Sequence, residues 1–277
     1  MTLDTDTAWE LWGARDPYFG VLTNSRYRAS VLTEEGKAEF FEIGRQHVEH
    51  VLTVIRTHFE PTFAAQRVFD FGCGVGRLVI PFASVAETVL GMDISRSMLE
   101  EAARNCEALG IGNARLVMSD DQLSSADGVF DLVHTCIVLQ HIEIHRGREL
   151  FSRLVRKIRS GGYGAIHVTF AWDAHPETYG QIPPTPVVPP PSVWALIKQT
   201  VKSSLGLSPP ERKDLPAPVN PDPDPEMQMN YYNLSELMFV LQRAGVQQVH
   251  TEMTDHGGAL GAFLFFRIPP ELTPAGG

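Results

Sequence analysis

The chain has 277 residues, 43% of them hydrophobic, which is enough for one large domain with a substantial core. Its formal net charge of −10 argues against sequence-independent nucleic-acid binding, because neutralising phosphates requires clustered Lys and Arg. No stretch approaches the roughly 18 apolar residues of a membrane span. No secretory signal is evident, and three unevenly spaced cysteines favour reduced thiols, no zinc site and a cytoplasmic location.

Residues 1–60 are predicted to form an N-terminal helical cap or lid. Residues 34–59 carry apolar side chains at helical spacing, and Pro61 ends that helix. Residues 1–33 mix polar, aromatic and turn-forming residues. Their aromatic side chains are expected either to form a small apolar cluster or to cover a ligand, and they include Trp9, Trp12, Tyr18 and Phe19.

The most informative segment is an apolar strand over 67–71 that contains Asp70 and leads into a glycine-rich turn. Gly72, Gly74 and Gly76 stand at alternate positions before a helix expected over 75–83. Glycines permit positive φ and let a ligand lie against the backbone, and a helix N-terminus suits an anionic group. Arg77 stands where a dinucleotide-binding turn needs a third small residue, which disfavours that class of site.

A second acid follows at the spacing expected of a ribose-binding carboxylate. A strand over 88–92 leads to Asp93, roughly 20 residues beyond the glycine turn. A carboxylate there is able to accept hydrogen bonds from both ribose hydroxyls. Ser95 is expected to cap a helix over 95–109, which Gly110 ends.

Strands and helices continue to alternate, with strands near 114–118, 129–135 and 162–170 and a helix near 145–159. This alternation predicts a parallel sheet with helices on both faces and a ligand site beyond the carboxyl ends of the strands. Residues 61–172 and 231–270 are therefore assigned to this domain. The end of the chain is predicted as a helix over 231–244, strands over 246–251 and 259–268, and a turn over 254–258.

Between these parts, residues 173–230 contain most of the prolines and form a Pro-rich insertion, with a short helix expected around 193–205. Such a segment lacks a regular backbone ladder. An insertion of this size is either a lid or poorly ordered, and the sequence leaves both open.

Four ordered motifs resemble those of the class I S-adenosylmethionine-dependent methyltransferases. They are the glycine turn, the strand ending in Asp93, the segment 130–142 and the segment 154–164. The resemblance implies an α/β, Rossmann-like sheet of seven strands in the order 3-2-1-4-5-7-6, with the last strand antiparallel. The usual proline before the Gly161-Gly162 pair is Ser160 here.

The same resemblance implies which residues bind S-adenosylmethionine and its product, S-adenosylhomocysteine. Asp70 and the glycine backbone would hold the methionine end, Asp93 the ribose, and Ile94 the adenine face. Asp120 is the first choice for the adenine amine, Asp121 the second, and Gln122 an edge contact. Thr135 and Cys136 would supply backbone near the sulfonium, and Cys73 is expected to be a small wall residue.

For the acceptor, a small molecule methylated on a hydroxyl of a natural product or sugar is the preferred hypothesis, with N- or C-methylation as the alternative. His141 is a candidate general base or a packing histidine, and His256 is a candidate base or part of a turn. His134, His145, His167 and His175 are interpreted as structural. Candidate acceptor-pocket residues are Tyr18, Trp172, Tyr231 and Tyr232.

Two functions of other classes stay open, a nicotinamide-dependent oxidoreductase and a non-catalytic cofactor-binding protein. No nucleic-acid partner, membrane span or metal is expected. The oligomeric state is not determined by the sequence, and a homodimer is among the options.

Overall fold

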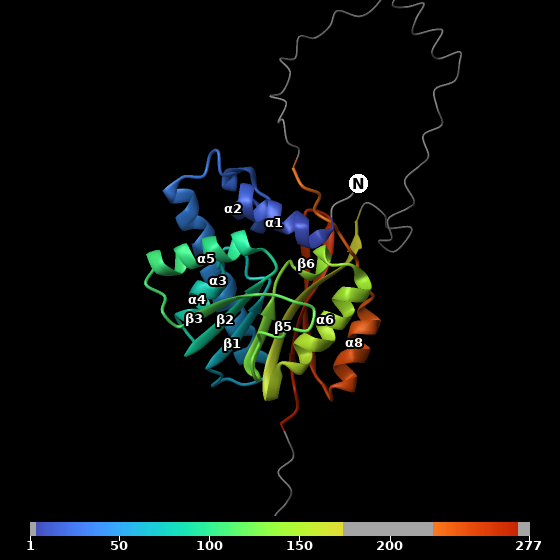
Figure 1. Cartoon of the computed structure of the whole chain (residues 1–277). Coiled ribbons are helices and arrows are strands. Elements are labelled where there is room, and N and C mark those ends of the chain that lie inside the picture. Colours follow the sequence, from blue (N-terminus) through green and yellow to red (C-terminus); the bar gives the residue numbers. More distant parts are fainter. Residues whose placement is uncertain (1–3, 174–223, 271–277) are drawn as a thin grey trace, which may run out of the picture. The chain divides into compact units, whose positions relative to one another are not determined.

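The structure is a computed structural model that describes residues 4–173 and 224–270. Its described strands form a seven-stranded sheet in the order β3-β2-β1-β4-β5-β7-β6 (Figure 1). The first five strands are parallel, and β7 runs antiparallel to both β5 and β6. The predicted fold class and strand order are therefore confirmed. The strands are β1 (Arg67–Phe71), β2 (Thr88–Asp93), β3 (Ala114–Met118), β4 (Phe130–Thr135), β5 (Ile158–Trp172), β6 (Val249–His256) and β7 (Ala259–Arg267).

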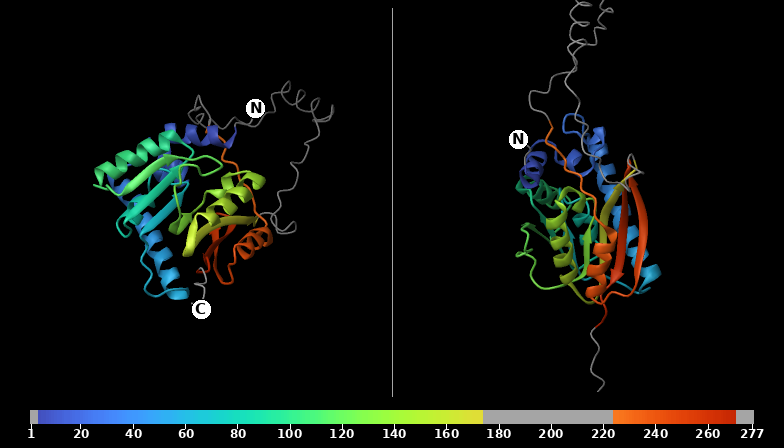
Figure 2. Two further views of the ribbon diagram at one scale, coloured as in Figure 1. Left: turned by 60° about the horizontal axis from the view of Figure 1, so that its bottom comes forward. Right: turned by 90° about the vertical axis from the view of Figure 1, so that its right-hand side faces the viewer.

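Helices cover both faces of the sheet, as the alternation of strands and helices predicts (Figure 2). On one face, α3 (Glu34–His58), α4 (Val79–Ala83) and α5 (Arg96–Ala108) enclose a core that contains Val68 and Leu132. On the other, α6 (Ile144–Arg156) and α8 (Leu234–Arg243) enclose a core that contains Phe69 and Val133. Adjacent strand residues therefore point to opposite faces, and both faces are apolar because both are buried.

Two strands in the C-terminal half of the sheet have bounds that differ from the predicted ones. β6 continues through His256, so the connection to β7 is only Gly257 and Gly258, with φ angles of 68° and 95°. Two adjacent residues with positive φ form the tight hairpin turn that matches strand twist, and glycine adopts them without strain. β5 begins at Ile158, before the predicted start, and its pairing with β4 shifts register between Phe130 and Leu132.

The N-terminal residues fold into short helices over the carboxyl ends of the strands (Figure 1). They are α1 (Thr5–Arg15), α2 (Pro17–Val21) and η1 (Ser25–Tyr27). Asp4 caps α1 by accepting a hydrogen bond from the backbone N–H of Thr7 at 3.0 Å. Trp12, Tyr18, Tyr27 and Phe40 form a small core with Met98 of α5. These aromatic residues thus form an apolar cluster, one of the two outcomes expected from the sequence.

The predicted helix around 193–205 and most of the Pro-rich insertion lie outside the described residues. Residues 224–233 are described, and they run without helix or strand into α8. Within the described parts of the chain, no helix is both long enough and apolar enough to cross a bilayer.

Candidate functional site

A cavity of about 540 Å³ lies beyond the carboxyl ends of the strands. This volume is within the ~300–1,000 Å³ range of small-molecule sites. Its walls come from the glycine turn, the ends of β2 and β4, helices α1 and α2, the segment around Met227 and Met229, and the β6–β7 hairpin. The cavity is where the topology of a parallel sheet places a ligand.

The glycine turn has its shape because neighbouring elements pack against it closely. Gly72 and Gly74 have φ angles of 74° and 52°. A Cβ on Gly72 would lie 2.3 Å from a methyl of Val138, and one on Gly74 would lie 2.6 Å from a methyl of Val21. Both glycines line the cavity, so their backbone is open on the remaining side. Gly76 lies outside it and faces Ala102 of α5 instead.

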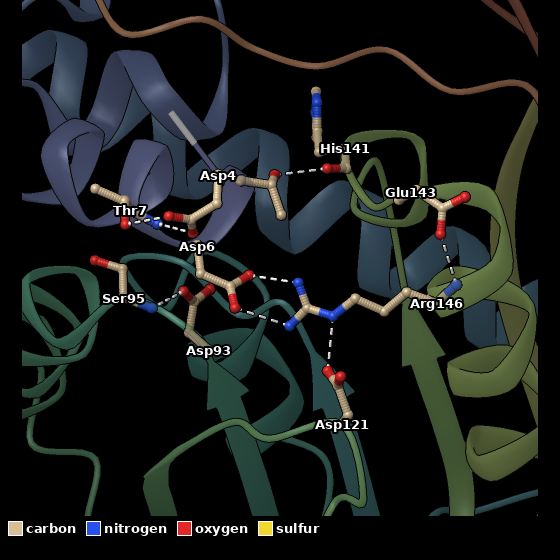
Figure 3. A network of polar contacts seen from close by, with 10 residues as sticks. Asp4, Asp6, Thr7, Asp93, Ser95, Asp121, His141, Glu143 and Arg146 are labelled. Atoms are coloured by element: carbon tan, nitrogen blue, oxygen red, sulfur yellow. Dashed lines mark hydrogen bonds and ion pairs between the residues drawn. The ribbon is translucent and has the colours of Figure 1, made fainter. Parts of the chain in front are cut away.

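Asp93 ends β2 and joins the glycine turn to the start of α5. One carboxylate oxygen accepts the N–H of Gly74 at 2.8 Å, and the other accepts the N–H of Ser95 at 2.9 Å. Figure 3 shows the Ser95 contact. Burial raises the pKa of this carboxyl to about 6, although the two backbone hydrogen bonds favour its ionised form. The carboxylate lines the cavity and retains lone pairs for a ligand hydroxyl.

Asp70 is held from behind by two histidines. Its Oδ1 lies 2.8 Å from Nδ1 of His134, and Nε2 of His134 lies 3.0 Å from Nε2 of His47. A carboxylate oxygen accepts hydrogen bonds, so Nδ1 of His134 donates to Asp70, and the two facing Nε2 atoms share one hydrogen. Burial lowers the pKa of His47 to about 2 and keeps that ring neutral. His134, interpreted as structural from the sequence, therefore orients a carboxylate of the cavity.

Among the three candidates for an adenine contact, only Asp121 lines the cavity. Asp120, the first choice, accepts the N–H groups of Gln122 and Ser124 at 2.8 and 3.1 Å and so caps its own loop. Asp121 pairs with Nε of Arg146 at 2.7 Å (Figure 3). Its position in the wall makes it the better placed of the two acids.

Arg146 also ties helix α1 to the rest of the site. Its two terminal nitrogens donate to both oxygens of Asp6 at 2.6 and 2.9 Å, a bidentate geometry (Figure 3). Glu10, one turn further along α1, accepts hydrogen bonds from the hydroxyls of Ser95 and Ser97 at 2.7 and 2.6 Å. Thus α1 is fixed over the cavity at three points. Two are on α6 and at the start of α5, and the third is the hydroxyl of Thr5, which donates to the backbone oxygen of His141 at 2.7 Å.

His141 lies in the cavity wall in one defined tautomer. Its Nδ1 is 2.8 Å from the backbone oxygen of Gln228, which only accepts, so Nδ1 carries the hydrogen and Nε2 is an acceptor. Nε2 lies 3.3 Å from the side-chain amide nitrogen of Gln140. Burial lowers the pKa of His141 to about 4. The ring is consequently neutral at neutral pH, and its unprotonated Nε2 accepts a hydrogen bond from the Gln140 amide.

The other candidate residues divide between the wall and the core. Cys73, Ile94, Cys136, Trp172 and His256 line the cavity. Burial raises the pKa of the Cys136 thiol to about 12, which makes it a neutral wall residue. Four candidates do not line it, namely Tyr18, Thr135, Tyr231 and Tyr232.

Two of those four have their hydroxyls engaged elsewhere. Tyr18 bonds Glu101 and Asn105 of α5 at 2.5 and 2.9 Å, and Tyr232 bonds the backbone oxygens of Leu139 and Ile142. Both rings are buried, which is why they serve packing between elements rather than the cavity wall.

Several wall residues were not among the sequence candidates, notably Asp6, Arg77, Gln140 and Arg146. From the sequence Arg77 only disfavours a dinucleotide site, although its place directly after the glycine turn is a usable indication. The contacts of Asp6 with Arg146 join residues 140 positions apart, so no local pattern reveals them. Among the described residues, no group of three or more His, Cys, Asp or Glu side chains is placed to hold a metal ion.

Residues 68–162 match a family model described as a methyltransferase domain. A similar curated protein is the magnesium-protoporphyrin O-methyltransferase of Synechocystis sp., which is 39% identical over 88 residues, 31% of this chain and 38% of that protein. Other curated matches are named as RNA methyltransferases, such as one from Thermosynechococcus vestitus. The chain thus spans well under two thirds of the length of the first curated relatives it matches.

Two solved structures share the fold across nearly the whole chain. Magnesium protoporphyrin IX methyltransferase from Synechocystis with bound S-adenosylhomocysteine covers 92% of this chain and 97% of its own, with a TM-score of 0.52 and 21% identity. The N-methyltransferase NodS from Bradyrhizobium japonicum, in complex with the same compound, covers 96% and 100%, with a TM-score of 0.56 and 13% identity. At these identities the likeness concerns the fold.

Proposed function

Since residues 68–162 carry a methyltransferase domain and the sheet has the class I fold of the S-adenosylmethionine-dependent methyltransferases, we propose that this protein methylates a small-molecule acceptor with S-adenosylmethionine. The observation that carries the proposal is the joining of Asp93 to the glycine turn within one cavity. A carboxylate and exposed glycine backbone side by side suit a nucleoside with an amino acid end.

The residues of the cavity fit such a cofactor. Asp93 would accept the ribose hydroxyls, Asp70 the ammonium group, and Asp121 the adenine amine, with Ile94 against the adenine face. The backbone at Gly72 and Gly74 would lie along the methionine end. When bound, S-adenosylmethionine supplies a methyl group already activated by the sulfonium, so the protein mainly has to align the acceptor.

A hydroxyl is the acceptor group that the wall supports best. Nε2 of His141 is an unprotonated acceptor in the cavity wall. An acceptor hydroxyl that replaced the Gln140 amide, now 3.3 Å away, would donate a hydrogen bond to it. With a pKa of about 4 this ring is a weak base, so its main contribution is to orient the acceptor oxygen. Its low pKa also means that Nε2 stays unprotonated throughout the neutral pH range.

Calorimetric titration with S-adenosylhomocysteine, followed by transfer of a tritiated methyl group into a metabolite extract, tests the proposal. The wild-type protein is expected to bind the compound and to label a small product. Asp93→Ala should weaken binding by about 10-fold or more, since hydrogen bonds to a charged group contribute ~1.5–3 kcal/mol. Absence of binding by the wild-type protein would refute the function, and binding without any labelled product would favour a non-catalytic role.

A further inference from the structure

Arg77 is a buried cation in the wall of the cavity. It follows the glycine turn directly, its side chain is among the buried charged residues at 6% exposure, and it lines the cavity. Its Nε is shielded from solvent and has no hydrogen-bond partner. Among the described residues no ion pair of Arg77 is found either. A buried charge without a partner is costly, so such a group calls for an anion that the folded chain alone does not supply.

The groups nearest in electrostatic terms are Tyr27, Asp70 and Cys136, and none of them neutralises the guanidinium by direct contact. Burial raises the pKa of Tyr27 and of Cys136, so both are uncharged. Asp70 has its Oδ1 bonded to Nδ1 of His134 at 2.8 Å. The guanidinium therefore faces two neutral groups and one acid that is engaged elsewhere.

Arg146 is the matched comparison, because it is the other arginine in the cavity wall. All three of its side-chain nitrogens bond carboxylates, two to Asp6 and one to Asp121. The chain itself thus satisfies Arg146, whereas it leaves Arg77 unpaired. Within the described chain, Arg77 therefore has hydrogen-bond donors without a protein partner for a ligand in the cavity, whereas every side-chain nitrogen of Arg146 already bonds a carboxylate.

Asp70 and Arg77 stand at the two ends of the glycine turn and line the same cavity. Resting on the proposed function, we propose that Arg77 binds a carboxylate of the ligand held in this cavity. The methionine end of S-adenosylmethionine has one, beside an ammonium group that suits Asp70, and the acceptor molecule is the second source. Guanidinium and carboxylate match in charge and in bidentate geometry.

The first arm of the test measures binding of S-adenosylhomocysteine and of its decarboxylated analogue to the wild-type protein and to Arg77→Met. Methionine keeps most of the volume but removes the charge. If the cofactor carboxylate is the partner, the variant should lose about 10-fold or more in affinity for S-adenosylhomocysteine and nothing for the analogue. Arg77→Lys should restore part of the difference, and Arg45→Met on the exposed face of α3 should change neither value.

The second arm covers an acceptor carboxylate. Here Arg77→Met keeps wild-type affinity for S-adenosylhomocysteine but fails to label a product in the extract. Benzoate, as a small carboxylate probe, should then inhibit transfer by the wild-type protein. Arg77→Lys should regain part of both the labelling and the inhibition.

Thermal unfolding of the ligand-free protein separates a binding role from a structural one. Removal of an unpaired buried charge should leave Tm unchanged or raise it, whereas a structural arginine would lower it on truncation. If wild type and Arg77→Met bind both compounds equally and label the same products, the inference is overturned while the proposed function stands. If the wild-type protein binds neither compound, the function itself has failed.

Discussion

The carboxyl group of Asp93 is buried and also lines the cavity in which the ligand is proposed to bind. Burial raises its pKa from the ordinary 3.8 to about 6, while the N–H groups of Gly74 and Ser95 hold its negative form in place. Because the folded pKa is raised, Asp93 contributes stability below about pH 4 that is lost as pH rises through 6. The free protein is thus less stable at the pH where the carboxylate is ready to bind.

This shift predicts that affinity for S-adenosylhomocysteine falls as the pH drops through 6. Below that value Asp93 must lose a proton before it accepts the ribose hydroxyls, so the dissociation constant should rise by up to about 10-fold per pH unit. Calorimetry between pH 5 and 8 measures the profile. Asp93→Asn should bind more weakly at pH 7.5 and show a flat profile, and an unchanged slope in that variant would assign the titration to another group.

His141 allows a test that separates its two nitrogens. The side-chain amide of Asn would lie close to the position of Nδ1, which donates to the backbone oxygen of Gln228. The longer side chain of Gln would place its amide close to the position of Nε2. If Nε2 orients the acceptor, His141→Asn should lower kcat/KM by about 100-fold, the cost of misplacing a reacting atom by about 1 Å, and His141→Gln should lose less. Both should bind S-adenosylhomocysteine normally. The reverse order of activity would assign His141 to packing alone.

At the scale of elements, α1 is held by long-range side-chain contacts that no local sequence pattern predicts. Asp6, half exposed, pairs with Arg146, and Glu10 caps the start of α5 through Ser95 and Ser97. Neither pair is within 80 positions along the chain. The helix therefore covers the cavity and is fixed at three points, since the Thr5 hydroxyl also donates to the backbone oxygen of His141. Each contact is open to removal by a separate substitution.

Asp6→Asn should loosen this cover without unfolding the domain. The pair is partly exposed, so its contribution is about 0.5–1 kcal/mol, and the dissociation rate of S-adenosylhomocysteine should rise roughly 2- to 5-fold. Stopped-flow displacement measures the rate, and the effect should shrink at high salt because solvent screens the pair. Arg45→Met is the control, because Arg45 pairs with Glu42 and Glu49 on α3 and, in the described part of the chain, has no ion pair with α1. An equal rise of the dissociation rate in that variant would show that the effect of Asp6→Asn is not specific to α1.

Local sequence patterns predict the sheet and the position of the site well. They do not predict side-chain positions that depend on contacts between residues distant in the chain. Ser95 caps α5 three residues from its partner Met98, so a short window suffices to find that helix. The choice between Asp120 and Asp121 depends on which side chain turns back onto its own loop, which spacing does not specify. From the sequence Tyr18 and Tyr232 are candidate pocket residues, yet the hydroxyl of each forms hydrogen bonds to an element distant in the chain.

At the scale of the whole molecule, one cavity draws its walls from segments spread along the described chain. Residues 5–23, 70–78, 136–142, 227–229 and 256–259 all contribute. The Gln228 backbone oxygen holds His141, so the end of the insertion and the segment after β4 are linked directly. A ligand that contacts these segments together therefore couples them, because each is ordered partly by the others.

Hydrogen exchange with and without S-adenosylhomocysteine should reveal that coupling. At 100 times the dissociation constant, binding adds about 2.7 kcal/mol to the stability of the folded state. Protection should then rise in α1, in the glycine turn and in residues 227–230 together, because exchange in each requires the cavity to open. Strand β6 up to Met253, which lies away from the cavity wall, serves as the internal reference. Protection confined to the glycine turn would mean that α1 and residues 227–230 move independently of the ligand, and the cavity would then be an open cleft in solution.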